Sequence, residues 1–314
     1  MVKRLLLASP RGYCAGVERA VETVERALAL YGSPVYVRKQ IVHNSHVVED
    51  LRSRGAVFVE TLADVPGGAT VVFSAHGIAP AVRREAEHLQ LTTIDATCPL
   101  VTKVHAQARR YAEAGYSIVL IGHAGHEEVE GTLGEAPDAI ILVESAEDAE
   151  HVSLPADRPL AYVTQTTLSV DETGEIVTVL RRRFPHIEGP AREDICYATS
   201  NRQWAVKELL AKIDLLLVVG SPNSSNSVRL VEVARADGTP AHLVDDLHEI
   251  DESWLEGCET VGLTSGASAP ERLVTDVCAW FAARGAEVSE RQAAHEDVSF
   301  KLPVELRRAE RAAA

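Results

Sequence analysis

Three cysteines, Cys14, Cys98 and Cys196, each begin a similar stretch of chain, and this threefold recurrence constrains the fold more than any other feature. The stretches read GYCAGVERAVETVERAL, DATCPLVTKVHAQARRYAEAG and DICYATSNRQWAVKELL. Each predicts an amphipathic helix with the cysteine at its start and a short apolar strand after it. Because the cysteines are far apart in the chain, they can meet only if three copies of one supersecondary unit pack around a common axis.

Polar loops recur at equivalent places in the three stretches. The first strand after each cysteine is followed by a polar loop, which reads VHNSH, HAGHEEVEGT or SPNSSNS in the three stretches. The polar residues of interest lie 28–30 positions after the cysteine, and they are His43 in the first loop, His126 and Glu128 in the second, and Ser224, Ser225 and Asn226 in the third. A later strand of each stretch ends in SAHG, TQTT or TSGAS, with His76, Thr166 and Ser268. The repeat therefore places polar side chains after two strands in each copy.

Strands that alternate with helices predict parallel βα units with right-handed connections. Ligands of open parallel sheets bind beyond the carboxyl ends of the strands, where the polar loops are expected. We therefore expect an α/β fold, a trefoil of three pseudo-threefold-related units with mainly parallel sheets around a central site. The expected units are residues 1–97, 98–194 and 195–314, the last with a C-terminal arm around VSFKLPVEL. The repeat is weakest before Cys196, where EGPAREDI is a poor strand sequence, whereas LLLA and TTID are plausible strands.

Charge and apolar content exclude several classes of partner. The formal net charge of −15 argues against a nucleic-acid backbone as the main partner. No stretch approaches the roughly 18–20 apolar residues of a membrane span, and LLLA near the N-terminus is too short for the apolar region of a signal peptide. We expect a cytoplasmic location, with neither a nucleic acid nor a membrane as partner. Five cysteines in such a chain favour metal or redox chemistry over a disulfide framework.

The three repeated cysteines suit an iron–sulfur cluster. A thiolate at a helix N-terminus is stabilised, so its pKa is expected to be lowered, and the thiolate is the ligand form for iron–sulfur clusters and zinc. Structural zinc usually has four protein ligands, often in C-x₂-C pairs, and this chain has no such pair. Three distant cysteines instead suit a [4Fe–4S] cluster in which one iron is open. Cys258 and Cys278 are expected to be structural, since Cys278 lies on an apolar helical stripe.

The other loop residues suit an anion with many acceptor oxygens, such as phosphate or diphosphate. They are His43, His76, His126, Ser224, Ser225, Asn226 and Ser268. The chain has neither a Walker A motif nor G-x-G-x-x-G, so a nucleotide is not indicated. Glu128 lies in a loop of donors, which suits a general acid. Glu127 and Glu130 compete for that role, and the repeat does not separate the three.

These motifs resemble those of the 4-hydroxy-3-methylbut-2-enyl diphosphate reductase family, which completes the methylerythritol phosphate route to isoprenoids. They run from about residue 10 to residue 272 in family order: GYCAGV, VHN, SAHG, DATCPLVTKVH, GHAGHEEVEGT, TQTTLSV, ICYATSNRQ, GSPNSSNS and SGASAP. Together the motifs are highly specific, and no ligand position departs from the family pattern. Glu127 occupies a position that varies in the family, which favours Glu128 as the acid.

The resemblance implies a trefoil around an oxygen-sensitive [4Fe–4S] cluster held by Cys14, Cys98 and Cys196. The substrate hydroxyl would bind the open iron, and Thr166 would help Glu128 to relay a proton. The diphosphate would be held by His43, His76, His126, Ser224, Ser225, Asn226 and Ser268. Two electrons and two protons then expel water and yield isopentenyl or dimethylallyl diphosphate. A ferredoxin or flavodoxin is the expected electron donor.

Two other functions remain open at this point. One is quinolinate synthase, which is also a pseudo-threefold protein with a three-cysteine cluster. A chain with that activity would need groups that bind a dicarboxylate and an imine. The His, Ser and Asn set argues against that chemistry. A non-enzymatic iron–sulfur sensor would need a module that binds DNA or a partner protein, and neither the charge nor the motifs supply one.

Overall fold

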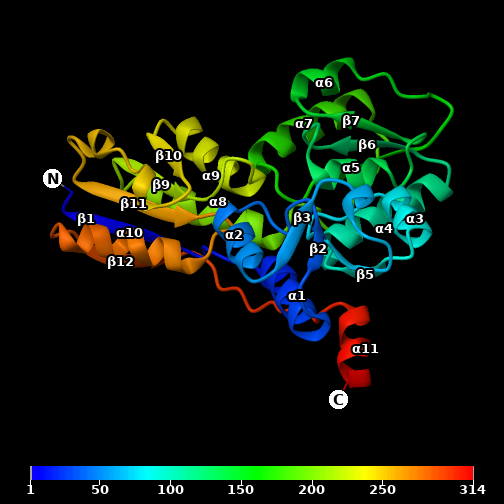
Figure 1. The fold of residues 1–314 in the computed structure, drawn as a ribbon. Coiled ribbons are helices and arrows are strands. Elements are labelled where there is room, and N and C mark those ends of the chain that lie inside the picture. Colours follow the sequence, from blue (N-terminus) through cyan, green and yellow to red (C-terminus); the bar gives the residue numbers. More distant parts are fainter. Residues whose placement is uncertain (1, 314) are drawn as a thin grey trace. The chain divides into compact units, whose positions relative to one another are not determined.

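The computed structural model describes residues 2–313, which form three parallel β-sheets connected by helices (Figure 1). The chain divides into two compact units. Unit 1 contains Met1–Val17, His43–Val47 and Tyr197–Ser299, and unit 2 contains Glu18–Val42, Val48–Cys196 and Phe300–Ala314. The α/β class with parallel sheets is therefore confirmed, whereas the division at residues 97 and 194 stays a prediction. No helix of the described residues is long and apolar enough to span a membrane.

Unit 1 contains one five-stranded sheet in the order β10-β9-β11-β1-β12. The strands are β1 (Arg4–Ser9), β9 (Leu215–Val219), β10 (Ala241–Val244), β11 (Thr260–Ser265) and β12 (Glu287–Gln292). The helices are α8 (Tyr197–Leu210), α9 (Ser225–Ala236) and α10 (Glu271–Ala283), and the 3₁₀ turns are η2 (Leu247–Glu249) and η3 (Glu252–Leu255). Every ladder of this sheet is parallel, as alternating strands and helices predict.

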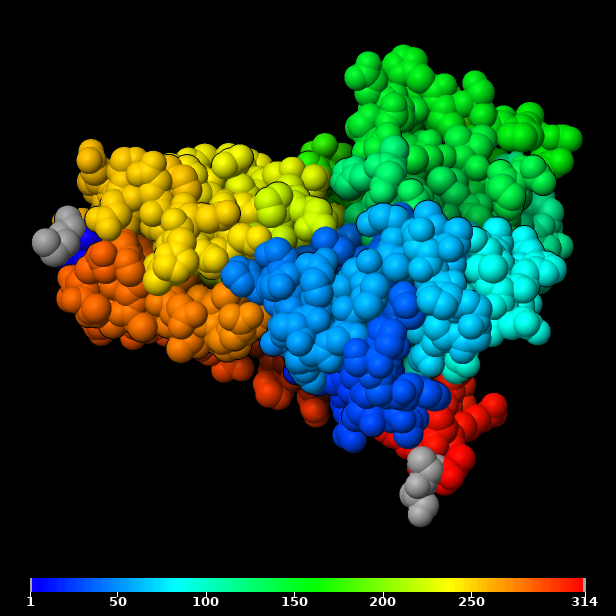
Figure 2. Space-filling model, viewed as in Figure 1, coloured from blue at the N-terminus to red at the C-terminus, as the bar shows by residue number. Residues whose placement is uncertain are grey.

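Strand β1 is buried on both faces, which is why its sequence is a continuous apolar run. Leu5 and Leu7 belong to an apolar core with Phe281 of α10, and the alternate residue Leu6 packs with Leu209 of α8. Figure 1 shows β1 between β11 and β12. In Figure 2 a small blue patch at the N-terminal end of the chain is visible beside the yellow and orange segments.

Unit 2 contains two sheets, in the orders β3-β2-β4-β5 and β7-β6-β8. The first has β2 (Val35–Arg38), β3 (Ala56–Val59), β4 (Thr70–Phe73) and β5 (Thr92–Asp95), and the second has β6 (Ser117–Ile121), β7 (Ile140–Val143) and β8 (Leu160–Thr164). The helices α3 (Pro80–His88), α4 (Pro99–Glu113), α5 (Glu127–Leu133), α6 (Ala146–His151), α7 (Val170–Arg183) and α11 (Val304–Ala313) and the turn η1 (Leu62–Asp64) belong to this unit. The helices α1 (Ala15–Tyr31) and α2 (Ser45–Ser53) each contain residues of both units.

The three sheets repeat one strand order, and the strand before each cysteine takes the fourth place. In β3-β2-β4-β5 this strand is β5, which precedes Cys98, and in β10-β9-β11-β1 it is β1, which precedes Cys14. Strand β1, expected with residues 1–97, thus pairs with β11 and β12 instead of with β2–β4. In the third sheet the place is taken by an isolated bridge between Ala161 and Glu188, within the poor strand sequence before Cys196. The expected weakness of this strand is confirmed.

Candidate active site

The three repeated cysteines occupy the same position in the fold. Cys14, Cys98 and Cys196 each directly precede the first residue of a helix, namely α1, α4 and α8. The three residues are partly exposed, and none of them forms a disulfide bond. Cys258 is buried, and Cys278 lies within α10 against the apolar core of unit 1. The structure therefore separates three cysteines at helix starts from two with ordinary packing roles.

The backbone around each cysteine is also equivalent. Each cysteine N–H donates to the carbonyl oxygen of the second residue beyond a strand end, in β11, β4 and β8 respectively. The bonds are Cys14 N to Ala267 O (3.3 Å), Cys98 N to Ala75 O (2.9 Å) and Cys196 N to Thr166 O (3.0 Å). Because these strands end in the TSGAS, SAHG and TQTT loops, each cysteine is tied directly to a polar loop of its repeat.

The donor set fits an iron–sulfur cluster, because thiolates are the usual ligands of such clusters. Burial raises the pKa of Cys14, although the charge of Arg202 and the N–H groups at the helix start act in the opposite direction. The lowering expected from helix position alone is thus wrong for Cys14, since the desolvation of the thiolate outweighs it. A bound metal would supply the missing positive charge, because cysteine ligands lose their protons on binding.

In unit 2, Glu128 and Thr166 form a buried acid site. Thr166 donates its backbone N–H to Glu128 Oε2 at 2.9 Å, and its hydroxyl lies 3.0 Å from both carboxyl oxygens. The side chain of Glu128 is nearly inaccessible, and among the described residues no lysine or arginine forms an ion pair with it. Because the carbonyl of Thr166 accepts the N–H of Cys196, one residue connects a candidate cluster ligand with a candidate acid.

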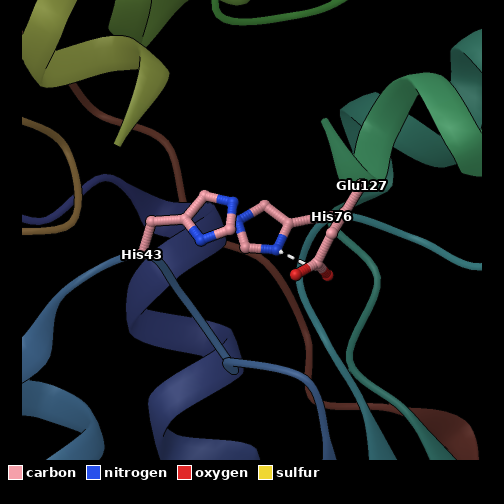
Figure 3. A group of neighbouring side chains, drawn as sticks. All are labelled: His43, His76 and Glu127. Carbon is pink, nitrogen blue, oxygen red and sulfur yellow. Dashed lines mark ion pairs between the residues drawn. The ribbon is translucent and has the colours of Figure 1, made fainter. Parts of the chain in front are cut away.

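The structure separates the three neighbouring glutamates. Figure 3 shows the His76 imidazole directed at the Glu127 carboxylate, with Nδ1 and Oε2 3.4 Å apart. Burial acts to raise the pKa of Glu127, but His76 and Lys39 outweigh burial and hold this pKa below the usual glutamate range. Glu130 is half-exposed and forms an ion pair with Lys39. Of the three, only Glu128 is buried beside Thr166, which supports its role as the acid.

His126 is held as a neutral imidazole at the start of α5. Its Nδ1 accepts the backbone N–H of Glu128 at 3.1 Å and caps the helix. Burial lowers the pKa of His126, although the charge of Glu128 acts in the opposite direction. The acceptor role of Nδ1 places the proton of the neutral ring on Nε2, which makes that atom a donor. His76 meets this ring edge-on, with centroids 5.9 Å apart.

In unit 1 the structure brings together His43, Ser224, Asn226 and Ser268. Ser268 Oγ donates to the carbonyl of His43 at 2.9 Å and lies 3.3 Å from Ser224 Oγ. Asn226 Oδ1 accepts the N–H of Ala267 at 2.8 Å. Ser224 caps helix α9, whose first residue is the remaining predicted serine, Ser225. Unit 1 thus contains a compact set of hydrogen-bonding groups next to the loop that binds the Cys14 amide.

Two residues that support this set were missed in the sequence. Thr199, three residues after Cys196, accepts a hydrogen bond from Asn226 Nδ2 at 3.3 Å, and Ser227 donates its hydroxyl to Ser224 Oγ at 2.9 Å. A Cβ at Gly266 would overlap Ser227 Oγ, so the glycine of SGAS permits this close approach. Thr199 lies inside the ICYATSN motif and Ser227 inside the SPNSSNS motif. The length of these polar motifs was the sequence signal that could have identified the two residues.

Histidines 76 and 126, Glu128 and Thr166 lie in unit 2 with two of the cysteines, and the remaining predicted site residues lie in unit 1. The expectation that all these loops reach one central cavity stays a prediction.

The sequence of this chain is similar to those of known proteins. The family model described as "LytB protein" matches residues 5–282. The 4-hydroxy-3-methylbut-2-enyl diphosphate reductase of Acidothermus cellulolyticus is 63% identical over 98% of this chain and 91% of its own length. The protein of the same name from Burkholderia pseudomallei is 56% identical over 98% of both chains.

Solved structures agree with these matches. The E-1-hydroxy-2-methyl-but-2-enyl-4-diphosphate reductase of Plasmodium falciparum matches with a TM-score of 0.97 and 42% identity, over 100% of this chain and 99% of that one. A structure of (E)-4-hydroxy-3-methyl-but-2-enyl diphosphate reductase, described as the terminal enzyme of the non-mevalonate pathway, matches with a TM-score of 0.63 and 31% identity. It covers 90% of this chain and 100% of that one.

Proposed function

Because this chain belongs to the LytB protein family, we propose that it reduces (E)-4-hydroxy-3-methylbut-2-enyl diphosphate to isopentenyl and dimethylallyl diphosphate. This is the last step of the methylerythritol phosphate, or non-mevalonate, route to isoprenoids. The likeness extends over nearly the full length of the relatives, and it favours this reaction over quinolinate synthesis or a sensor role. The observation that carries the proposal is Thr166, which bonds both to the Cys196 amide and to Glu128.

Cys14, Cys98 and Cys196 would hold a [4Fe–4S] cluster with one iron that has no protein ligand. When bound, such a cluster supplies electrons and a Lewis-acidic position for the substrate hydroxyl. The equal placement of the three cysteines at helix starts supports this ligand set, and so does their separation from Cys258 and Cys278.

Glu128 would deliver the proton with which the hydroxyl oxygen leaves as water. In the overall reaction the C–O bond breaks, and the allylic skeleton takes two electrons and a second proton at one end or the other. The Thr166 hydroxyl, 3.0 Å from both carboxyl oxygens, orients the acid and can pass a proton along the same hydrogen bond. Burial of Glu128 keeps water from competing for these bonds, so their directions are well defined.

The diphosphate would be bound by histidine, serine and asparagine side chains instead of a set of lysines. We assign this role to His43, Ser224, Ser225, Asn226 and Ser268 of unit 1 and to His76 and His126 of unit 2. The hydrogen bonds within the unit 1 set hold its members in place before the ligand arrives, which lowers the cost of ordering them. These contacts are remote from the breaking bond, so they serve mainly for orientation.

We further propose a ferredoxin or flavodoxin as the electron donor and the cytoplasm as the location of the reaction. The donor assignment follows from the need for single electrons at low potential. A reduction rate that falls steeply as salt is added would support docking of an acidic carrier protein, and a rate independent of salt would count against it.

The proposal is tested by anaerobic purification, iron and sulfide analysis, and turnover of the diphosphate alcohol with a low-potential dye as reductant. We expect about four irons and four sulfides per chain and both five-carbon diphosphates as products. Glu128→Gln should keep the iron and lose most turnover, because a general acid typically contributes about 10²–10⁴-fold. Glu130→Gln is the matched control and should retain activity, since Glu130 is half-exposed and pairs with Lys39. An iron-loaded protein without turnover would contradict the proposed reaction.

A further inference from the structure

Three cations recur with the cysteines. A basic residue lies five or six positions after each cysteine, in the helix that follows that cysteine. These residues are Arg19 in α1, Lys103 in α4 and Arg202 in α8. Arg19 and Arg202 are buried and Lys103 is half-buried. Buried cations need hydrogen-bond partners, so the groups that these three contact are informative.

Arg19 binds the loop before the second cysteine. Its Nη1 donates to the carbonyl oxygens of Ala96 at 2.9 Å and Thr97 at 3.0 Å, and its Nη2 donates to that of Asp95 at 3.4 Å. These three residues directly precede Cys98. The cation after the first cysteine therefore anchors the loop that leads to the second.

Lys103 does the same for the third cysteine. Its Nζ donates to the carbonyl oxygens of Arg192 at 2.8 Å and Glu193 at 2.9 Å, and to Asp194 Oδ1 at 3.0 Å. These residues lie two to four positions before Cys196. The other oxygen of the Asp194 carboxylate accepts the N–H of Thr164, so the loop is also tied to the end of β8.

Arg202 completes the series. Its Nη2 donates to the carbonyl oxygen of Gly12 at 2.8 Å and lies 3.5 Å from those of Arg11 and Tyr13, the three residues before Cys14. Its Nη1 pairs with Glu296 at 3.0 Å. The cation after the third cysteine thus anchors the loop of the first, and each of the three sets of contacts lies within a single unit.

The two arginines also act on the thiols by charge. The Arg19 guanidinium donates to the carbonyl of Thr97 at 3.0 Å, and the Arg202 guanidinium lies 3.5 Å from the carbonyl of Tyr13. Because Thr97 and Tyr13 directly precede Cys98 and Cys14, each positive charge lies close to one of the proposed cluster ligands. The three thiolate ligands of a cluster carry negative charge, and reduction adds one more unit. Nearby positive charge and hydrogen bonds therefore favour the reduced form.

We propose that Arg19, Lys103 and Arg202 are positioning residues, which hold the three cysteine loops in matching conformations, with the two arginines also making the bound cluster easier to reduce. The inference rests on the proposed function, because it requires that the three cysteines hold a cluster. A packing role alone does not explain why three equivalent side chains each bind the loop of the next cysteine in cyclic order.

Arg19 gives the sharpest test, because within the described part of the chain its guanidinium donates to backbone carbonyls and to no acidic side chain. We compare Arg19→Met, which removes charge and donors, with Arg19→Lys, which keeps the charge. Arg26→Met is the matched control, since it removes an exposed cation seven residues further along α1. For each anaerobically purified protein, the reduction potential of the cluster and the rate of iron release to a chelator are measured.

We expect the one-electron reduction equilibrium of Arg19→Met to fall on the order of tenfold and its iron release to be several-fold faster. Arg19→Lys should regain the parent potential, and Arg26→Met should match the parent in both measurements. Lys103→Met should also release iron faster than the parent.

Any one of three results would overturn the inference. The first is a reduction potential and an iron-release rate in Arg19→Met that equal those of the parent, and the second is a change in Arg26→Met as large as that in Arg19→Met. The third is an iron-release rate in Lys103→Met that equals that of the parent. If Arg19→Met holds no iron, recovery of iron in Arg19→Lys supports the inference and its absence overturns it. A parent protein without iron would overturn the proposed function as well, so the two failures are distinguishable.

Discussion

Replacement of Thr166 by valine tests the link between the acid and the cluster ligand. Valine has nearly the shape of threonine, so the buried site is not opened, and the backbone bonds to Glu128 and Cys196 remain. The change removes only the hydroxyl, which lies 3.0 Å from both oxygens of the carboxyl group. Any loss of activity therefore reports on this hydrogen bond.

The expected magnitude follows from the strength of such bonds. A hydrogen bond to a charged group contributes about 1.5–3 kcal/mol, and each 1.4 kcal/mol corresponds to about a factor of ten in rate. If the bond is strongest when Glu128 gives up its proton, kcat of Thr166→Val falls roughly 10- to 150-fold. KM for the diphosphate alcohol should change less than about threefold, because the proposed diphosphate contacts are elsewhere.

The assay is anaerobic steady-state turnover of iron-loaded protein, with Glu128→Gln and the double variant measured in parallel. Because the hydroxyl acts through the carboxyl group, the double variant should be scarcely slower than Glu128→Gln alone. Two outcomes refute the reasoning. One is Thr166→Val with full iron and activity within twofold of the parent, and the other is strict additivity of the two changes.

Three further changes test other parts of the site. Cys98→Ser should lose most bound iron whereas Cys278→Ser keeps it, and equal iron in both would refute the ligand assignment. Ser268→Ala should raise KM for the diphosphate about tenfold through loss of one charged hydrogen bond, with a smaller change in kcat in the same steady-state assay. Glu127→Gln should be about 1 kcal/mol less stable at neutral pH. Because folding lowers the pKa of Glu127, the contribution of its carboxylate to the free energy of unfolding is fully present above about pH 4.3. This contribution is lost as the pH falls through the pKa that Glu127 has in the folded protein. Urea unfolding from pH 7 to pH 3 should therefore show a stability difference between parent and variant that shrinks toward acid.

The repeat could be predicted from the sequence because its signals are local. Apolar runs, helical periodicity and polar loops at strand ends all lie within one stretch of chain. The backbone hydrogen bonds of Cys14, Cys98 and Cys196 go to corresponding positions in the fold, which confirms that these stretches are equivalent. The missing strand before Cys196 was also foreseeable, because EGPAREDI lacks the apolar residues that a buried strand needs.

Strand pairing and side-chain direction depended on packing. The sequence does not indicate that β1 pairs with β11, because the two strands are separated by most of the chain and no local pattern connects them. It also left Glu127, Glu128 and Glu130 as competitors, because neighbouring residues at a helix start point in different directions. Only the surrounding elements decide that Glu128 meets Thr166 while Glu127 meets His76.

The sequence by itself determined the α/β class, the three cysteines and the polar loops, because each is encoded by residues within one repeat. Only the tertiary structure decided the partners across repeats. Arg19, Lys103 and Arg202 stand at repeated positions in the sequence, yet nothing there shows that each binds the loop of another cysteine. Contacts between residues that are distant in the chain depend on how whole elements pack, and that information is spread over the entire sequence.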